Sequence, residues 1–180
     1  RGRQLAAQAL DYRIEGLPVF GLAPQGARLD QVPAGDYAVL LHATSRPDKQ
    51  WPPANWHALA RMLMDDGLQV LLPWGNLAEQ QAAQAIAAAV PGAKVLPALS
   101  LAQCALLLRD AAAVIGVDTG LTHLSAALDR PTVALFAATP AWRFGPYWTV
   151  RAASLGSQGS WPTPAEVRER LVPLMSASPA

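Results

Sequence analysis

The sequence has little of what several common classes of protein require. A single cysteine, Cys104, excludes a disulfide within the chain and favours a reducing compartment. No run of about 18 uncharged apolar residues occurs, so no membrane span is predicted. Only 15% of the residues are charged and the formal net charge is +1, so charge gives no argument for a nucleic-acid partner.

Several motifs that carry chemistry are also missing. The sequence has no Walker A motif, no G-x-G-x-x-G and no G-x-S-x-G, which argues against a P-loop enzyme, the usual dinucleotide fingerprint and a hydrolase elbow. The three histidines, His42, His57 and His123, lack the spacing of metal ligands, and we predict no bound metal and no cofactor. Cys104 lies in an apolar helical pattern, where a buried small hydrophobe is more common than a nucleophile.

What the chain does have is a 52% hydrophobic composition and, from residue 37 onward, a regular alternation of strand and helix patterns. Apolar runs predict strands over 37–43, 68–74, 93–97, 113–118 and 131–137. Amphipathic patterns and capping residues predict helices over 52–67, 77–90, 100–111, 120–129 and 163–175. This alternation predicts an α/β fold, a three-layer Rossmann-like domain with a parallel sheet. We assign this domain to residues 37–180, and residues 1–36 to a helix and an irregular connector.

The most polar of the predicted strand ends is "GVDTGLTHLSAAL", residues 116–128. Asp118, Thr119 and Gly120 stand where the fourth strand meets a helix, and the free N–H groups of a helix N-terminus form an anion site. Gly120 allows close approach of a ligand to the backbone. His123 follows one turn into the helix. The alternative is that Asp118 or Thr119 only caps the helix and His123 only packs.

Three other strand ends point to the same edge, since parallel sheets bind ligands at the carboxyl ends of their strands. Thr44, Ser45 and Lys49 follow the first strand, and hydroxyls and cations suit phosphate or sugar hydroxyls. Glu79 follows the second strand and either complements the helix dipole or holds the hydroxyls of a ribose. Leu99 follows the third strand and is a candidate wall for adenine. We expect Trp51 to pack in the core.

Four stretches of the sequence carry a family likeness: "HATSRPDKQWP", "LPWGNLAEQ", "VLPALSLAQCALLLRDA" and "VIGVDTGLTHLSAALDRPTVALF". Together they resemble the C-terminal half of the lipopolysaccharide heptosyltransferases, most closely the heptosyltransferase I branch of the ADP-heptose glycosyltransferase family. The likeness covers about residues 37–136. It implies the GT-B fold, with two Rossmann-like domains, of which this chain supplies the donor-binding one. The stretch "FAATPAWRFGPY" departs from the Gly-Pro-Thr turn expected there.

The resemblance implies an inverting transfer of L-glycero-D-manno-heptose from ADP-heptose to the Kdo of the lipid A inner core. It places Lys49 at the leaving group and Asp118 at the heptose hydroxyls, both as catalytic-site residues, with the base, an aspartate, in the other domain. The remaining donor contacts that it implies are Thr44 and Ser45 at the pyrophosphate, Glu79 at the ribose, Leu99 at the adenine, and Thr119, Gly120 and His123 near the phosphates.

Three further expectations follow from the resemblance. The acceptor domain is absent from this chain, which we therefore expect to bind ADP or ADP-heptose without transferring sugar. Residues 1–36 are expected to be the interdomain helix and connector. The family works at the cytoplasmic face of the bacterial inner membrane. Alternatives that remain open are heptosyltransferase II, another member with a different acceptor, a non-catalytic nucleotide-sugar module, and a structural domain whose polar loops are only caps.

Overall fold

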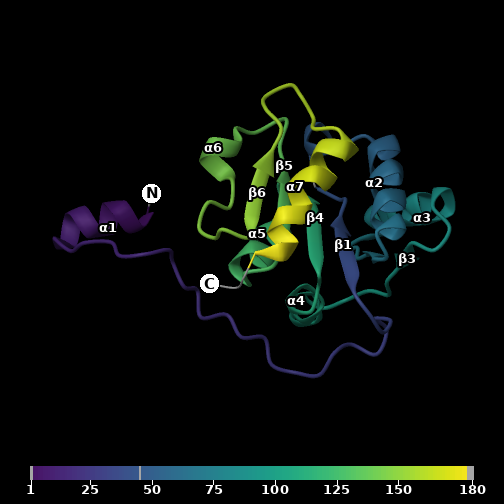
Figure 1. Cartoon of the computed structure of the whole chain (residues 1–180), viewed down its shortest axis with the longest axis horizontal. Helices are drawn as coiled ribbons and strands as arrows, with labels where there is room; N and C mark the ends of the chain where they lie inside the picture. The colour runs from purple at the N-terminus through teal and green to yellow at the C-terminus, as the bar shows by residue number, and fades with distance from the viewer. Residues whose placement is uncertain (1, 45, 178–180) are drawn as a thin grey trace.

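The computed structural model describes residues 2–44 and 46–177, and its centre is one parallel sheet of six strands. The strand order is β3-β2-β1-β4-β5-β6, so the direction of winding reverses between β1 and β4 (Figure 1). The strands are β1 (Tyr37–Leu41), β2 (Gln69–Leu72), β3 (Lys94–Val95), β4 (Ala113–Val117), β5 (Thr132–Leu135) and β6 (Ala152–Leu155). The predicted Rossmann-like α/β fold is confirmed.

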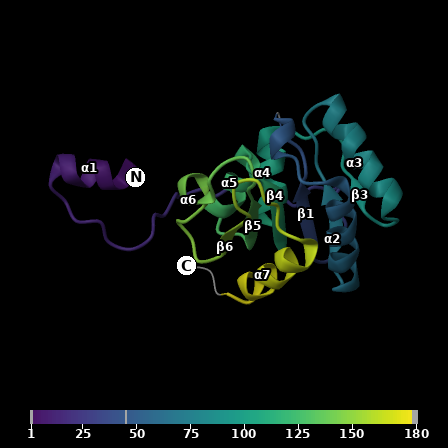
Figure 2. The same ribbon diagram turned by 90° about the horizontal axis from the view of Figure 1, so that it is seen from above.

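Helices cover both faces of this sheet. Alternate residues of β1 enter two separate apolar clusters: Ala38 and Leu40 pack with α2, α3 and α7, whereas Val39 and Leu41 pack with α4 and the end of α5. Figure 2 shows α7 on the opposite side of the sheet from α4 and α5. The helices are α1 (Gly2–Leu10), the short 3-10 helix η1 (Pro47–Lys49), α2 (Pro53–Asp65), α3 (Leu77–Ala89), α4 (Leu101–Arg109), α5 (Gly120–Ala127), α6 (Ala141–Phe144) and α7 (Pro164–Ser176).

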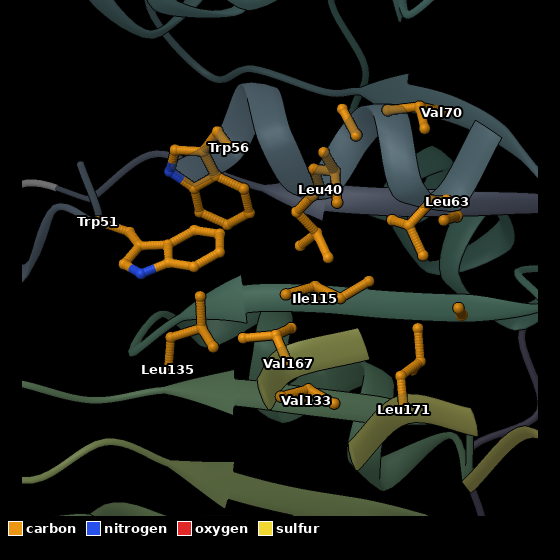
Figure 3. Close-up of a cluster of buried hydrophobic side chains, with 14 of the residues drawn as sticks. Leu40, Trp51, Trp56, Leu63, Val70, Ile115, Val133, Leu135, Val167 and Leu171 are labelled. Carbon is orange, nitrogen blue, oxygen red and sulfur yellow. The ribbon is translucent and has the colours of Figure 1, made fainter. Parts of the chain in front are cut away.

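The two apolar clusters together explain why β1 and β4 are continuous apolar runs, as expected for strands covered on both faces. The larger cluster, on the side of α2 and α7, also contains two tryptophans. Trp51 and Trp56 are almost fully buried there and meet edge to face, with ring centroids 4.8 Å apart (Figure 3). The Trp51 indole N–H donates to the carbonyl of Pro162 across 3.0 Å. The prediction that Trp51 belongs to the core is confirmed.

Three elements were not predicted from the sequence, the strand β6, the one-turn helix α6 and the short 3-10 helix η1. The sequence of β6 is Ala-Ala-Ser-Leu, which contains none of the β-branched or aromatic residues that mark strands. It is an edge strand held by four parallel pairings with β5. Its strand conformation therefore depends on a tertiary contact that propensity does not reveal.

The segment before β1 stands partly apart from the sheet. In Figures 1 and 2, α1 lies away from the other helices, and residues 11–36 run back to β1 with little regular structure. Leu5 and Leu10 are 66% and 74% exposed, so this helix presents apolar surface to solvent. Among residues 2–44 and 46–177, no helix combines the length and the apolar character that crossing a membrane requires.

The close approach of α5 to β4 gives a prediction about stability. A Cβ on Gly116, in the middle of the β4 sequence, would overlap Thr122 Oγ1 and lie 2.9 Å from Leu41 Cβ. We expect Gly116→Ala to lower the free energy of unfolding by about 1–3 kcal/mol, measured by urea denaturation, because a packed core resists added volume. Gly120→Ala is the matched control, since a Cβ there meets no atom within 4 Å. Equal stability of the two variants would contradict the packing described.

Candidate functional site

A cavity of about 790 Å³ opens at the carboxyl ends of β1, β2 and β4. Most of the residues predicted for the site line it, namely Thr44, Lys49, Glu79, Leu99, Asp118, Thr119 and Gly120. His123 is not among the lining residues but contacts Asp118. Ser45 lies outside the described residues. The topology explains this convergence, because β2, β1 and β4 are neighbours in the sheet and their ends share one edge.

Side chains from three separate segments of the chain contact the carboxylate of Asp118. Lys49 Nζ, at the end of η1, is 2.7 Å from Oδ2. The Thr139 hydroxyl, in the loop after β5, donates to the same oxygen across 2.8 Å, and His123 Nε2 lies 3.3 Å from Oδ1. The side chains of Asp118 and Lys49 are only 12% and 18% exposed. The sequence suggested both residues for one site but did not predict this direct contact.

These partners determine the charge at the site. The hydrogen bond from His123, followed by those from Lys49 and Thr139, holds the pKa of Asp118 far below the usual range for a carboxyl group, although burial opposes the effect. Asp118 is therefore ionised at neutral pH and neutralises Lys49 in this structure. A ligand that brings its own negative charge competes with Asp118 for the ammonium group of Lys49.

The N-terminus of α5 is not closed by a side chain. Thr119 is the N-cap residue, but its hydroxyl makes no capping hydrogen bond and instead lies 3.3 Å from Thr122 Oγ1. By contrast, α3, α4 and α7 are each capped by the side chain of their N-cap residue. Thr122 is fully buried and donates to the carbonyl of Val117, so it serves the fold. The start of α5 therefore presents backbone N–H groups to the cavity, as an anion site requires.

Glu79 and Leu99 lie where the sequence placed them, with different local roles. The Glu79 carboxylate accepts from Gly75 N at 2.7 Å and from Asn76 Nδ2 at 2.9 Å, which fixes it at the start of α3. A carboxylate has about four acceptor positions, so these two bonds leave capacity for ligand hydroxyls. Leu99 is partly buried and, with Leu121 on α5, forms part of the apolar wall of the cavity.

Two side chains at this site were missed by sequence reasoning. Thr139 binds Asp118, and the only signal was its position just after the fifth predicted strand. Trp74 follows β2, lines the cavity and donates its indole N–H to the carbonyl of Leu96 at 2.6 Å.

Cys104 also lines the cavity, but burial raises the pKa of its thiol, in keeping with its interpretation as a small hydrophobe. His42 is buried between the Leu40 and Glu79 carbonyls, consistent with a structural role.

A doubly wound parallel sheet with an uncapped helix N-terminus and a partly buried ion pair at its carboxyl edge is typical of Rossmann-like ligand-binding domains. Comparison with known families narrows the class. The sequence profile of glycosyltransferase family 9 (heptosyltransferase) matches residues 1–174. The chain belongs to this family of glycosyltransferases.

Several proteins similar to this chain are heptosyltransferases. The chain is 47% identical over 140 residues to lipopolysaccharide heptosyltransferase 1 of Pseudomonas aeruginosa, covering 77% of this chain and 39% of that protein. It is 39% identical over 148 residues to heptosyltransferase 1 of Escherichia coli K12, covering 82% and 46%. The E. coli heptosyltransferase WaaC, solved with ADP, superimposes with a TM-score of 0.75 at 34% identity, over 96% of this chain and 55% of that one. This chain thus spans about half the length of its relatives.

The ionised state of Asp118 leads to a pH prediction. Because the folded-state pKa is depressed, the stabilisation is fully present above the unfolded pKa of about 3.9 and is lost as the pH falls through the lower folded value. We expect Asp118→Asn to lower the free energy of unfolding by about 1–3 kcal/mol at pH 7, since Lys49 loses its partner. The deficit should persist at pH 5 and shrink below pH 4 in urea denaturation.

Asp48 provides the control for this experiment. It pairs with Arg46, but both side chains are at least half exposed, and solvent weakens such pairs. Asp48→Asn should therefore change stability less than Asp118→Asn at every pH. A deficit for Asp118→Asn that is the same at pH 7 and pH 3 would show that the carboxylate charge is not its cause.

Proposed function

We propose that this chain is the donor-binding half of a lipopolysaccharide heptosyltransferase. It would bind ADP-L-glycero-D-manno-heptose, from which heptose is transferred, with inversion, to the Kdo of the lipid A inner core. The observation that carries the proposal is the Lys49–Asp118 pair beside the uncapped start of α5, on the wall of the 790 Å³ cavity. A cation, a helix N-terminus and a carboxylate in one cavity suit a ligand with a charged diphosphate and a polyhydroxyl sugar.

Within this proposal, Lys49 moves from Asp118 to the diphosphate when the donor binds. Its charge then stabilises the ADP leaving group as the bond to the anomeric carbon breaks. Asp118 is left to accept hydrogen bonds from heptose hydroxyls, held in place by Thr139 and His123. The ammonium group of Lys49, which balances Asp118 in this structure, thus balances the phosphates in the complex.

The other donor contacts follow from the shape of the cavity. Thr119 and Gly120 offer N–H groups to the phosphates, and Thr44 lines the same region from the end of β1. Glu79 accepts from the ribose hydroxyls, and the apolar wall at Leu99 covers the adenine. Ser45, outside the described residues, remains a proposed pyrophosphate contact. Two solved structures of one relative support a nucleotide here, E. coli WaaC with ADP and with ADP-2-deoxy-2-fluoro heptose.

The choice of acceptor rests on the relatives. Identity to heptosyltransferase 1 proteins reaches 40–47% over 140–148 residues, whereas identity to heptosyltransferase 2 of Salmonella typhimurium is 35% over 96 residues. We therefore propose Kdo as the acceptor sugar, bound by the part of the relatives that this chain does not span, which would also supply the base. The reaction would take place at the cytoplasmic face of the inner membrane. The chain alone should then bind donor without turnover.

Calorimetric titration with ADP, ADP-heptose, UDP and GDP tests the proposal. We expect binding that prefers the two adenine nucleotides, because the apolar wall at Leu99 suits adenine, whereas the ribose that Glu79 would hold is common to all four ligands. Lys49→Ala should weaken ADP binding by about 10- to 100-fold, the range for a hydrogen bond to a charged group. Glu79→Ala should weaken it about tenfold by the same reasoning for one ribose contact.

Each variant has a control in the same chain. Lys94, whose ammonium group binds the Gln31 carbonyl, and Glu169 both lie away from the cavity. Lys94→Ala and Glu169→Ala should leave ADP affinity unchanged. If a folded wild-type chain binds UDP or GDP as well as ADP, or if Lys49→Ala and Lys94→Ala bind alike, the proposed donor site is wrong.

A further inference from the structure

Trp148 lies outside the cavity but packs against a residue that binds the site carboxylate. Its indole ring and the imidazole of His123 have centroids 5.8 Å apart and planes tilted by 37°. The same imidazole reaches Asp118, with Nε2 at 3.3 Å from Oδ1. Trp148, in the loop that precedes β6, is therefore linked to Asp118 through the ring of His123.

The loop that carries Trp148 is fastened to the far end of α5. The Thr149 hydroxyl donates to the Asp129 carboxylate, and Arg151 Nη1 donates to the Asp129 carbonyl at 3.1 Å. Since α5 runs from Gly120 to Ala127, with His123 in its first turns, these bonds fix the loop along the helix. From the other side, Phe20 packs edge-on against Trp148, with ring centroids 5.7 Å apart. The position of the indole therefore depends on the bonds of its loop to Asp129 and on its ring contacts with Phe20 and His123.

The imidazole of His123 has an unusual lack of other restraints. A histidine that orients a charged group commonly has its second ring nitrogen hydrogen-bonded, which fixes the tautomer and the ring plane. Nδ1 of His123 is buried, yet no partner for it occurs among residues 2–44 and 46–177. With one hydrogen bond alone, the ring can rotate about its Cβ bond. The packing of Trp148 against the imidazole is a contact that opposes this rotation.

We propose that Trp148 is a positioning residue of the donor site: it holds the His123 ring so that Nε2–H points at Asp118, and Phe20 keeps Trp148 in place. The ligand-binding consequence rests on the proposed function, whereas the effect on the ring does not. Through this chain of contacts, the segment before β1 influences the carboxylate that pairs with Lys49. The cavity itself contains none of the aromatic residues involved.

Nitrogen NMR of the His123 ring in the ligand-free chain at pH 8 tests the positioning directly. In the wild type, we expect one tautomer, with the proton on Nε2. Trp148→Ala and Trp148→Leu should shift the ring signals towards an average of the two tautomers, and Trp148→Phe should restore the wild-type pattern. Trp142→Ala, a change to the tryptophan of the neighbouring helix α6, which is 66% exposed, should have no effect. Thermal unfolding identifies any variant that is not folded.

Affinity for ADP-heptose, measured by calorimetry on the same variants, tests the consequence for the site. A misdirected hydrogen bond to Asp118 should weaken binding about fivefold to tenfold in Trp148→Ala and Trp148→Leu. Trp148→Phe should remain within twofold of the wild type, and Phe20→Ala should fall between the two groups. Unchanged affinity in a folded Trp148→Leu chain would overturn the role in the site.

The two measurements separate this inference from the proposed function. If the wild type fails to bind ADP-heptose, the proposed donor site is wrong, but the NMR arm still decides whether Trp148 positions His123. If the ring signals are the same in the wild type, Trp148→Ala and Trp148→Leu, the inference is overturned whatever the affinities are. A restored ring pattern with Trp148→Phe supports ring packing over simple filling of space.

Discussion

The carboxylate of Asp118 is the point on which the site depends. Its partners come from η1, from α5 and from the loop after β5, segments up to 69 residues away in sequence. They meet because β1, β4 and β5 are adjacent in the sheet and end at one edge. The apolar core that fixes the strand order therefore also fixes the distance between Lys49 and Asp118. A site built this way is preorganised by the fold, and a ligand needs only to exchange partners within it.

Charge and helix geometry give this edge its chemical character. The start of α5 is uncapped although three other helices of the chain have side-chain caps, and the open end lies beside a partly buried lysine. An uncapped helix end is a local loss of stability, since its N–H groups have no side-chain acceptor. Such a loss is expected where a ligand supplies the missing acceptor, and a diphosphate has the charge and the oxygen atoms to do so.

Sequence patterns predicted most of the fold because the central strands are apolar on both faces and the helices carry clear caps, as with Ser100 and Thr163. They did not predict β6, whose short Ala-rich sequence becomes a strand only through pairing with β5. For the site, the sequence predicted which strand ends come together. The ion pair of Lys49 with Asp118, and the contribution of Thr139, depend on side-chain distances that follow from packing. Likewise, the hydrogen bond from the Thr122 hydroxyl to the Val117 carbonyl, which commits this side chain to the fold, follows from burial and not from a sequence pattern.

Backbone amide shifts on titration with ADP would test the central claim most directly, because they report where the nucleotide binds. The account predicts the largest shifts at Thr119, Gly120 and Leu121, with further shifts at Lys49 and at Glu79, and little change along α7. Saturable shifts that instead cluster on α7, on the opposite face of the sheet from α5, and on the edge strand β6 would contradict it. So would unchanged amide signals at the start of α5 at concentrations of ADP that saturate binding.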